Sequence, residues 1–236
     1  MRPATPVPRA GRALALAGAG AAYLGLAVVV WWGVWSGHPS STTTCGCGDA
    51  AFTLWYTAFA AHALGTGAPL FHTALQWHPA GVDVLDQASQ LGLGVPLAPV
   101  TWAWGPVAAL DVALTLAPAA SALAAFALGE RWGLWRPASF AGGLLCGFSP
   151  LVVLNLAEAH LVVGCAAALP LGALALDVLL VGPCRRPVVV GVLLGLLAVW
   201  QLLISPEVLL LAVVAGGVVV VAAAGARAVA DRRTAA

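Results

Sequence analysis

The residues of this chain that can do chemistry are concentrated in one polar segment, residues 36–105. Its centre is the run Cys45-Gly-Cys-Gly-Asp49-Ala-Ala-Phe-Thr-Leu-Trp55. Asp49 is the leading candidate for a catalytic residue, because a carboxylate can act as a general base or hold a cation. The same position also fits a helix N-cap, where a carboxylate satisfies free backbone N–H groups. Both interpretations are open at this stage.

Three further polar residues, Glu158, His160 and Glu207, follow the ends of hydrophobic segments. We expect them on the same side of the membrane as Asp49, where costly carboxylates tend to have a role. Purely structural roles fit them as well. Glu158 and His160 suit a hydrated turn, and Glu207 suits the first turn of a helix, near the positive end of its dipole.

The remaining candidates for substrate binding around Asp49 are Trp55, His62, His78, Asn155 and Gln201. An aromatic residue such as Trp55 is also typical of a membrane-interface anchor. The spacing of His62, His72 and His78 puts them on no shared helical face, so it predicts no metal site by itself. A divalent cation is an open cofactor with no ligands assigned.

The two cysteines of the polar segment, Cys45 and Cys47, are expected to be unpaired small residues in a Gly-rich loop. Their C-x-C spacing is tight for a disulfide, which needs Cα atoms about 5.5 Å apart in a set orientation. A metal pair is the alternative, but no second pair follows at a zinc-finger spacing.

The elements that must position these residues are membrane helices. Of the 236 residues 61% are hydrophobic and 8% are charged, whereas soluble domains carry about 25% charged residues. Continuous apolar runs of about 20 residues predict helices that cross a bilayer, and they do not alternate as barrel strands do. We therefore expect an all-α, polytopic helical bundle with membrane lipids as its surroundings. A net charge of +1 excludes nucleic acid as a partner.

Six transmembrane helices are expected, at residues 13–35, 106–128, 138–154, 161–181, 188–204 and 208–224. Within the long loop 36–105 we expect an interfacial helix at 50–64. A second short helix or a re-entrant segment is expected at 84–100, broken at Pro96 and Pro99. Residues 13–226 would form a single transmembrane domain between basic tails at 1–12 and 227–236.

All ten basic residues are arginines, and they fall into four clusters, none of them in the loop 36–105. The clusters are Arg2, Arg9 and Arg12; Arg131 and Arg136; Arg185 and Arg186; and Arg227, Arg232 and Arg233. Basic residues beside membrane spans stay on the cytoplasmic side. The sequence thus predicts a multi-pass plasma (inner) membrane protein with both termini in the cytoplasm and the long loop outside.

Four sequence elements resemble those of GT-C-type membrane glycosyltransferases. They are Gly48-Asp49 to Trp55, Pro79-Ala-Gly-Val-Asp83, Gly147-Phe-Ser-Pro150 with His160-Leu161, and Gln201-Leu-Leu-Ile-Ser-Pro-Glu207. The resemblance covers residues 40–210. It implies transfer of a sugar from a polyprenyl-phosphate donor to an acceptor on the outer face, with Asp49 as the acid or base of the first outer loop.

Two departures from this family pattern bear on function. Ala50 stands where many relatives carry a second acid, and relatives usually continue with more spans. The chain is therefore expected to be an active enzyme, a fragment, an inactive copy, or a half that needs a protein partner to supply missing helices. The alternative function is a non-catalytic membrane scaffold or a small transporter subunit lined by Asp111, Glu158 and Glu207.

Overall fold

The computed structural model describes residues 9–181 and 184–234. About 75% of the chain is helical. The described sheet is one antiparallel pair, β1 (His72–Thr73) with β2 (Val82–Asp83). The all-α prediction is confirmed.

Within the described residues, four helical stretches are long and apolar enough to cross a membrane: Ala10–Val30, Leu91–Arg131, Arg136–Ala157 and Leu161–Leu180. Two shorter apolar helices follow at Pro187–Leu202 and Pro206–Ala222. These helices indicate a membrane-embedded protein. Four of the six predicted spans therefore correspond to helices that are long enough to cross a membrane, and the other two correspond to shorter apolar helices.

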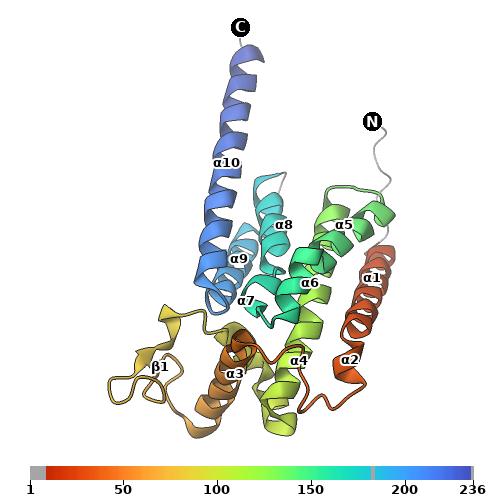
Figure 1. The fold of residues 1–236 in the computed structure, drawn as a ribbon. Coiled ribbons are helices and arrows are strands. Elements are labelled where there is room, and N and C mark those ends of the chain that lie inside the picture. The colour runs from red at the N-terminus through yellow and green to blue at the C-terminus, as the bar shows by residue number, and fades with distance from the viewer. Residues whose placement is uncertain (1–8, 182–183, 235–236) are drawn as a thin grey trace.

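The apolar helical stretches run in alternating directions along the chain (Figure 1). In chain order the helices are α1 (Arg9–Val30), α2 (Trp32–Trp35), α3 (Gly48–Thr66), η1 (Val84–Asp86), α4 (Leu91–Arg131), α5 (Arg136–Phe148), α6 (Pro150–Ala157), α7 (Leu161–Gly164), α8 (Ala168–Leu180), α9 (Pro187–Leu202) and α10 (Pro206–Thr234). The start of α1, the end of α4, the start of α5 and the ends of α8 and α10 point the same way (Figure 1). We call this the arginine end, because it carries Arg12, Arg131, Arg136, Arg185 and Arg186. The helix α3 and the β-hairpin lie towards the opposite end.

Several predicted boundaries differ from the structure. Helix extends into both predicted tails, because α1 begins at Arg9 and α10 continues to Thr234. Residues 1–8 and 235–236 of those tails lie outside the described residues. The first half of the turn predicted at 155–160 is helix, since α6 continues to Ala157, and the turn itself lies at 158–160. The break predicted at Gly147–Pro150 is confirmed, because Ser149 separates α5 from α6.

The helix α4 corrects the prediction of a short helix at 84–100 broken by Pro96 and Pro99. It runs through both prolines and bends instead at Gly105, where φ is 89° and ψ is 168°. Glycine adopts this backbone conformation without a Cβ penalty. Pro96 has no N–H for the carbonyl four residues before it, that of Gly92. That carbonyl instead accepts a hydrogen bond of 2.8 Å from Trp200 Nε1 on α9, which lets the helix continue.

The expected helix at 50–64 is confirmed as α3, which packs along the first segment of α4. Trp102 Nε1 donates to the Ala61 carbonyl at 3.1 Å. A Cβ on Gly94 would lie 2.9 Å from that of Ala60, so the helices approach through small residues.

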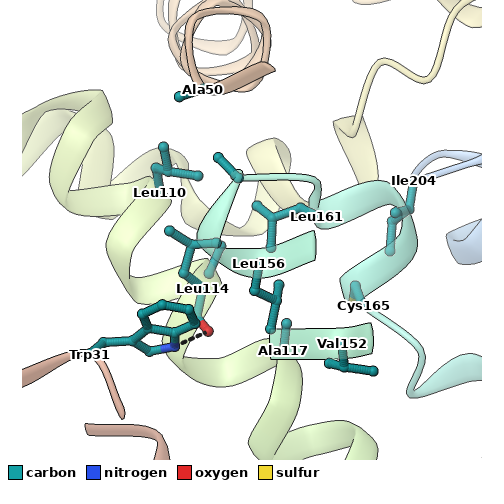
Figure 2. Close-up of a cluster of buried hydrophobic side chains, with 12 residues drawn as sticks. Trp31, Ala50, Leu110, Leu114, Ala117, Val152, Leu156, Leu161, Cys165 and Ile204 are labelled. Carbon is teal, nitrogen blue, oxygen red and sulfur yellow. Dashed lines mark hydrogen bonds between the residues drawn. The ribbon is translucent and has the colours of Figure 1, made fainter. Parts of the chain in front are cut away.

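A buried apolar cluster joins α2, α3, α4, α6, α7 and the end of α9 (Figure 2). Leu110, Leu156 and Leu161 are almost completely buried in it. Trp31 of the α1–α2 junction donates its indole N–H to the Leu114 carbonyl at 3.0 Å. This cluster holds the junction between α6 and α7 against the start of α3, where the candidate site lies.

Candidate functional site

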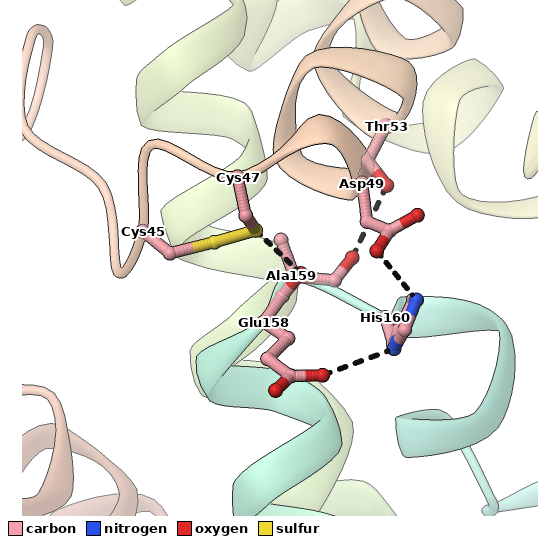
Figure 3. Close-up of a disulfide and its surroundings, with 7 residues drawn as sticks. All are labelled: Cys45, Cys47, Asp49, Thr53, Glu158, Ala159 and His160. Atoms are coloured by element: carbon pink, nitrogen blue, oxygen red, sulfur yellow. Dashed lines mark hydrogen bonds and ion pairs between the residues drawn. A yellow bond between two sulfur atoms is a disulfide. The ribbon is translucent and has the colours of Figure 1, made fainter.

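Asp49 lies in the first turn of α3, and its carboxylate is paired with a histidine from a distant part of the chain. Asp49 Oδ2 is 2.8 Å from His160 Nε2 (Figure 3). The N-cap of α3 is Cys47, which makes no capping hydrogen bond through its side chain. Of the two interpretations open from the sequence, the geometry favours a polar site over a simple cap.

His160 is oriented by a tight turn at the end of α6. Ala159 has a left-handed φ of 59°, while the His160 N–H bonds the Asn155 carbonyl and the Ala159 N–H bonds the Leu156 carbonyl. This is the Schellman pattern, in which a left-handed residue closes a helix. Alanine there costs about 1 kcal/mol relative to glycine. The turn directs the imidazole of His160 back towards α3.

Thr53 and Gln90 hold the same turn in place. Gln90 Nε2 donates to Thr53 Oγ1 at 3.0 Å, and Thr53 Oγ1 donates to the Ala159 carbonyl at 3.1 Å. Thr53 follows Asp49 by four residues, so both side chains share one face of α3. Neither Thr53 nor Gln90 is predicted as a site residue from the sequence, although the four-residue spacing from Asp49 to Thr53 is a signal that indicates Thr53.

Glu158 completes the group, with Oε2 3.7 Å from His160 Nδ1. The imidazole therefore lies between two carboxylates, and a protonated His160 would form an ion pair with each. The side chains of Asp49, His160 and Glu158 are 54%, 36% and 67% exposed, so the site opens to its surroundings. We call these three residues the acid–histidine site.

A disulfide between Cys45 and Cys47 borders the acid–histidine site, so the prediction of unpaired cysteines is wrong. The Cα atoms are 5.4 Å apart, less than the roughly 6.6–7.2 Å of an extended chain over two residues. Gly46 between them leaves the backbone free to curve this much. The Sγ of Cys47 contacts the Glu158 carbonyl oxygen at 3.3 Å, which places the disulfide against the turn that carries His160.

The structure does not place the other predicted binding residues in contact with Asp49. Trp55 stacks on Phe59 with ring centroids 5.2 Å apart, and Asn155 Nδ2 donates to the Leu151 carbonyl within its own helix. Gln201 is buried near the end of α9. The other three are exposed: His62 on α3, His78 in the hairpin, and Glu207 in the first turn of α10.

Tyr56 links α3 to the segment after the hairpin. Its phenol donates to Gln87 Oε1 at 2.8 Å. Burial raises the pKa of Tyr56 above its ordinary value, so the phenol stays protonated and keeps this donor role. The bond fixes the chain just before Gln90, which holds Thr53.

The described cations lie away from the acid–histidine site. Arg131 pairs with Asp177 at 2.6 Å, and Arg136 lies 3.6 Å from Glu130, both at the arginine end. Within residues 9–181 and 184–234, no three His, Cys, Asp or Glu side chains form a group that could hold a metal ion. Among the residues that the structure describes, His160 lies beside Asp49 and would supply positive charge there when protonated.

Comparison of the chain with protein-family models, curated proteins and solved structures finds no match.

Proposed function

We propose that this chain is a GT-C-like membrane glycosyltransferase that moves a sugar from a polyprenyl-phosphate donor to an acceptor hydroxyl. The observation that supports the proposal is the contact of 2.8 Å between Asp49 and His160. These residues belong to two separate elements of the family resemblance, the Gly48-Asp49 run and the His160-Leu161 pair. A shared site is what a common catalytic role would require of them.

The proposed topology has six membrane crossings. The alternating helix directions support it (Figure 1), with α9 and α10 as the fifth and sixth crossings. The arginine end would face the cytoplasm of a plasma (inner) membrane, following the positive-inside rule. The acid–histidine site would then face the outer side, where a lipid-linked sugar can be reached from the bilayer.

The proposed reaction assigns one role to each group. The Asp49 carboxylate takes the proton of the acceptor hydroxyl as a general base. The acceptor oxygen forms a bond to the anomeric carbon, the bond from that carbon to the phosphate oxygen breaks, and the electron pair leaves with the polyprenyl phosphate. His160 orients Asp49 through Nε2, and as imidazolium it offsets the charge of the leaving phosphate. Glu158 would hold His160 from the other side.

The test is sugar transfer by the purified full chain in lipid nanodiscs, with radiolabelled polyprenyl-phosphate hexoses and pentoses as donors and membrane glycans as acceptors. We expect Asp49→Ala to abolish transfer while expression is unchanged. Asp86→Asn is the matched control, because Asp86 is an exposed acid on η1 outside the acid–histidine site. Transfer by Asp49→Ala at the wild-type rate would refute the role of Asp49.

A second candidate is a non-catalytic membrane subunit. The openness of the site favours it, since Asp49 is 54% exposed and Glu158 is 67% exposed. This candidate predicts no transfer by the wild-type chain with any donor. It also predicts that Asp49→Asn leaves association with other membrane components unchanged. Pull-down with the tagged wild-type chain and with the tagged Asp49→Asn variant would compare their associations.

A further inference from the structure

A groove between α1, α4 and α5 opens at the arginine end of the bundle. Its volume is about 440 Å³. The helix α1 lines one side of it with Ala15, Gly18 and Ala19, which share one helix face at spacings of three and four residues. All three are small, so they leave a gap beside α5 that larger side chains would fill. The groove is separate from the acid–histidine site, since neither α3 nor the turn between α6 and α7 lines it.

The groove is apolar along its length and closed at its inner end. Phe126 of α4 is 3% exposed and forms its floor, while Pro137 and Phe140 of α5 form its second side. One turn beyond Ala19, Tyr23 stacks on Phe140 with ring centroids 4.7 Å apart, and its hydroxyl donates to the Phe140 carbonyl at 2.9 Å. This contact joins α1 to α5 and ends the groove there.

Two arginines stand at the open end of the groove. Arg136 lines it directly, and its Nη2 donates to the Gly11 carbonyl at 3.2 Å, so the guanidinium lies against the start of α1. Arg12 is exposed and precedes Ala15 by three residues, which puts it on the same side of α1 as the groove. Glu130 is the acid beside Arg136, with Oε2 3.6 Å from its Nε. The side chains of Arg12, Arg136 and Glu130 together carry one net positive charge.

The open end has the features of a lipid headgroup region. Trp132 and Trp135, which precede Arg136 in the chain, are 60% and 76% exposed, and tryptophan is enriched at the level of the headgroups. From Arg136 the groove follows α1 into the apolar stretch Ala10–Val30. The Arg136 side chain is 45% exposed, and the planar guanidinium matches the geometry of a phosphate.

We infer that this groove binds one anionic phospholipid, with an acyl chain between α1 and α5 and the headgroup phosphate on Arg136 and Arg12. The apolar walls match an acyl chain, and the net positive mouth matches an anionic headgroup. A soluble anion would match the mouth alone, and an uncharged lipid would match the walls alone. The site does not rest on the proposed sugar transfer. A lipid bound here would join the start of α1 to α5.

The test is thermal unfolding of the purified, delipidated full chain in detergent, titrated with dioleoyl phosphatidylglycerol or with dioleoyl phosphatidylcholine. A ligand that binds the folded state raises Tm by mass action. We expect a saturable rise in Tm with phosphatidylglycerol that exceeds the rise with phosphatidylcholine. Native mass spectrometry should show one retained phosphatidylglycerol per chain. Equal rises with the two lipids would overturn the inference, because the net charge of the headgroup would then play no part.

A pair of glycine variants tests the groove itself. A Cβ on Gly18, or on Gly25 of the same helix, meets nothing within 4 Å, so neither Gly18→Leu nor Gly25→Leu should disturb the packing. Gly18→Leu places a side chain in the groove and should remove the rise in Tm with phosphatidylglycerol. Gly25 does not line the groove, so Gly25→Leu should keep the rise. The same response from both variants would overturn the assignment of the lipid to this groove.

A pair of arginine variants tests the mouth of the groove. Arg136→Gln should weaken the apparent affinity for phosphatidylglycerol about fivefold or more. Arg185→Gln is the matched control, because it removes an exposed arginine at the same end from the loop between α8 and α9, and it should keep the wild-type affinity. Equal affinities of the two variants would count against the phosphate contact.

The glycine pair decides the question alone if Arg136→Gln does not fold. Light scattering covers the remaining occupant, a second copy of this chain. A wild-type dimer that Gly18→Leu converts to a monomer would assign the groove to that second copy and overturn the lipid inference.

Discussion

His160 Nε2 lies 2.8 Å from Asp49 Oδ2, and each residue is positioned by a different local backbone structure. The carboxylate comes from the first turn of α3, and the imidazole from the left-handed turn at Ala159. The pair is formed where two independent segments dock. Its geometry therefore depends on the contacts that join those segments.

The first prediction separates function from stability at this pair. Asp49→Asn and His160→Gln should each lower sugar transfer by about 100-fold or more, as loss of a general base or its partner does. Because the Asp49 side chain is exposed and that of His160 is partly exposed, solvent screens the pair and it should contribute at most about 1 kcal/mol to stability. A double-mutant cycle in transfer rate and in Tm would measure both effects. A large loss of Tm with unchanged transfer would contradict this prediction.

The second prediction concerns the hydroxyl of Thr53, which bonds the Ala159 carbonyl. Thr53→Val keeps the shape but leaves that buried carbonyl and Gln90 Nε2 without this partner, so it should destabilise the chain by about 1–3 kcal/mol. Transfer should also fall, because His160 follows Ala159 directly. Thr66→Val is the control on the same helix, since its hydroxyl bonds the His62 carbonyl in an exposed place. Equal Tm losses for both variants would count against a positioning role of Thr53.

The third prediction concerns the disulfide. Alkylation of the unreduced, denatured chain followed by peptide mass spectrometry should label Cys146, Cys165 and Cys184 but not Cys45 or Cys47. The bond closes a very short loop, so the loss of loop entropy that it imposes on the unfolded chain is small. Cys45→Ser with Cys47→Ser should therefore change Tm little. It should lower transfer, because Cys47 contacts the Glu158 carbonyl. Labelling of all five cysteines without reductant would show that the bond is absent.

The fourth prediction tests the packing of α5 with two neighbouring glycines. A Cβ on Gly143 would meet the Tyr23 hydroxyl and lie 2.7 Å from the Ala122 carbonyl oxygen, whereas a Cβ on Gly142 meets nothing within 4 Å. Gly143→Ala should therefore destabilise the bundle by about 1–3 kcal/mol through overpacking. Gly142→Ala should leave Tm unchanged or raise it slightly, because alanine favours helix. Unfolding of both variants side by side in the same detergent gives the comparison, and equal Tm values would argue against this packing of α5 on α1 and α4.

The sequence alone determined the class of this protein and the course of its apolar helices. Long runs of Ala, Leu and Val satisfy their backbone only as helices in lipid, so the all-α bundle followed from local composition. The apolar segments later seen as α1, α9 and α10 were recognisable for the same reason. The break at Ser149 was also readable, because it depends on Pro150, which follows it directly.

Only the tertiary structure decided that α4 continues through Pro96 and Pro99, whether the cysteines pair and which polar residues meet. Pro96 does not break α4 because Trp200, far along the chain, occupies the carbonyl that the proline leaves free. Cys45 and Cys47 reach bonding distance because the chain curves at Gly46, which brings their Cα atoms to 5.4 Å. Asp49 meets His160 through packing between segments that are distant in the chain. The local sequence pattern indicates which secondary structure each segment prefers. Contacts between distant residues depend on how all the segments pack together.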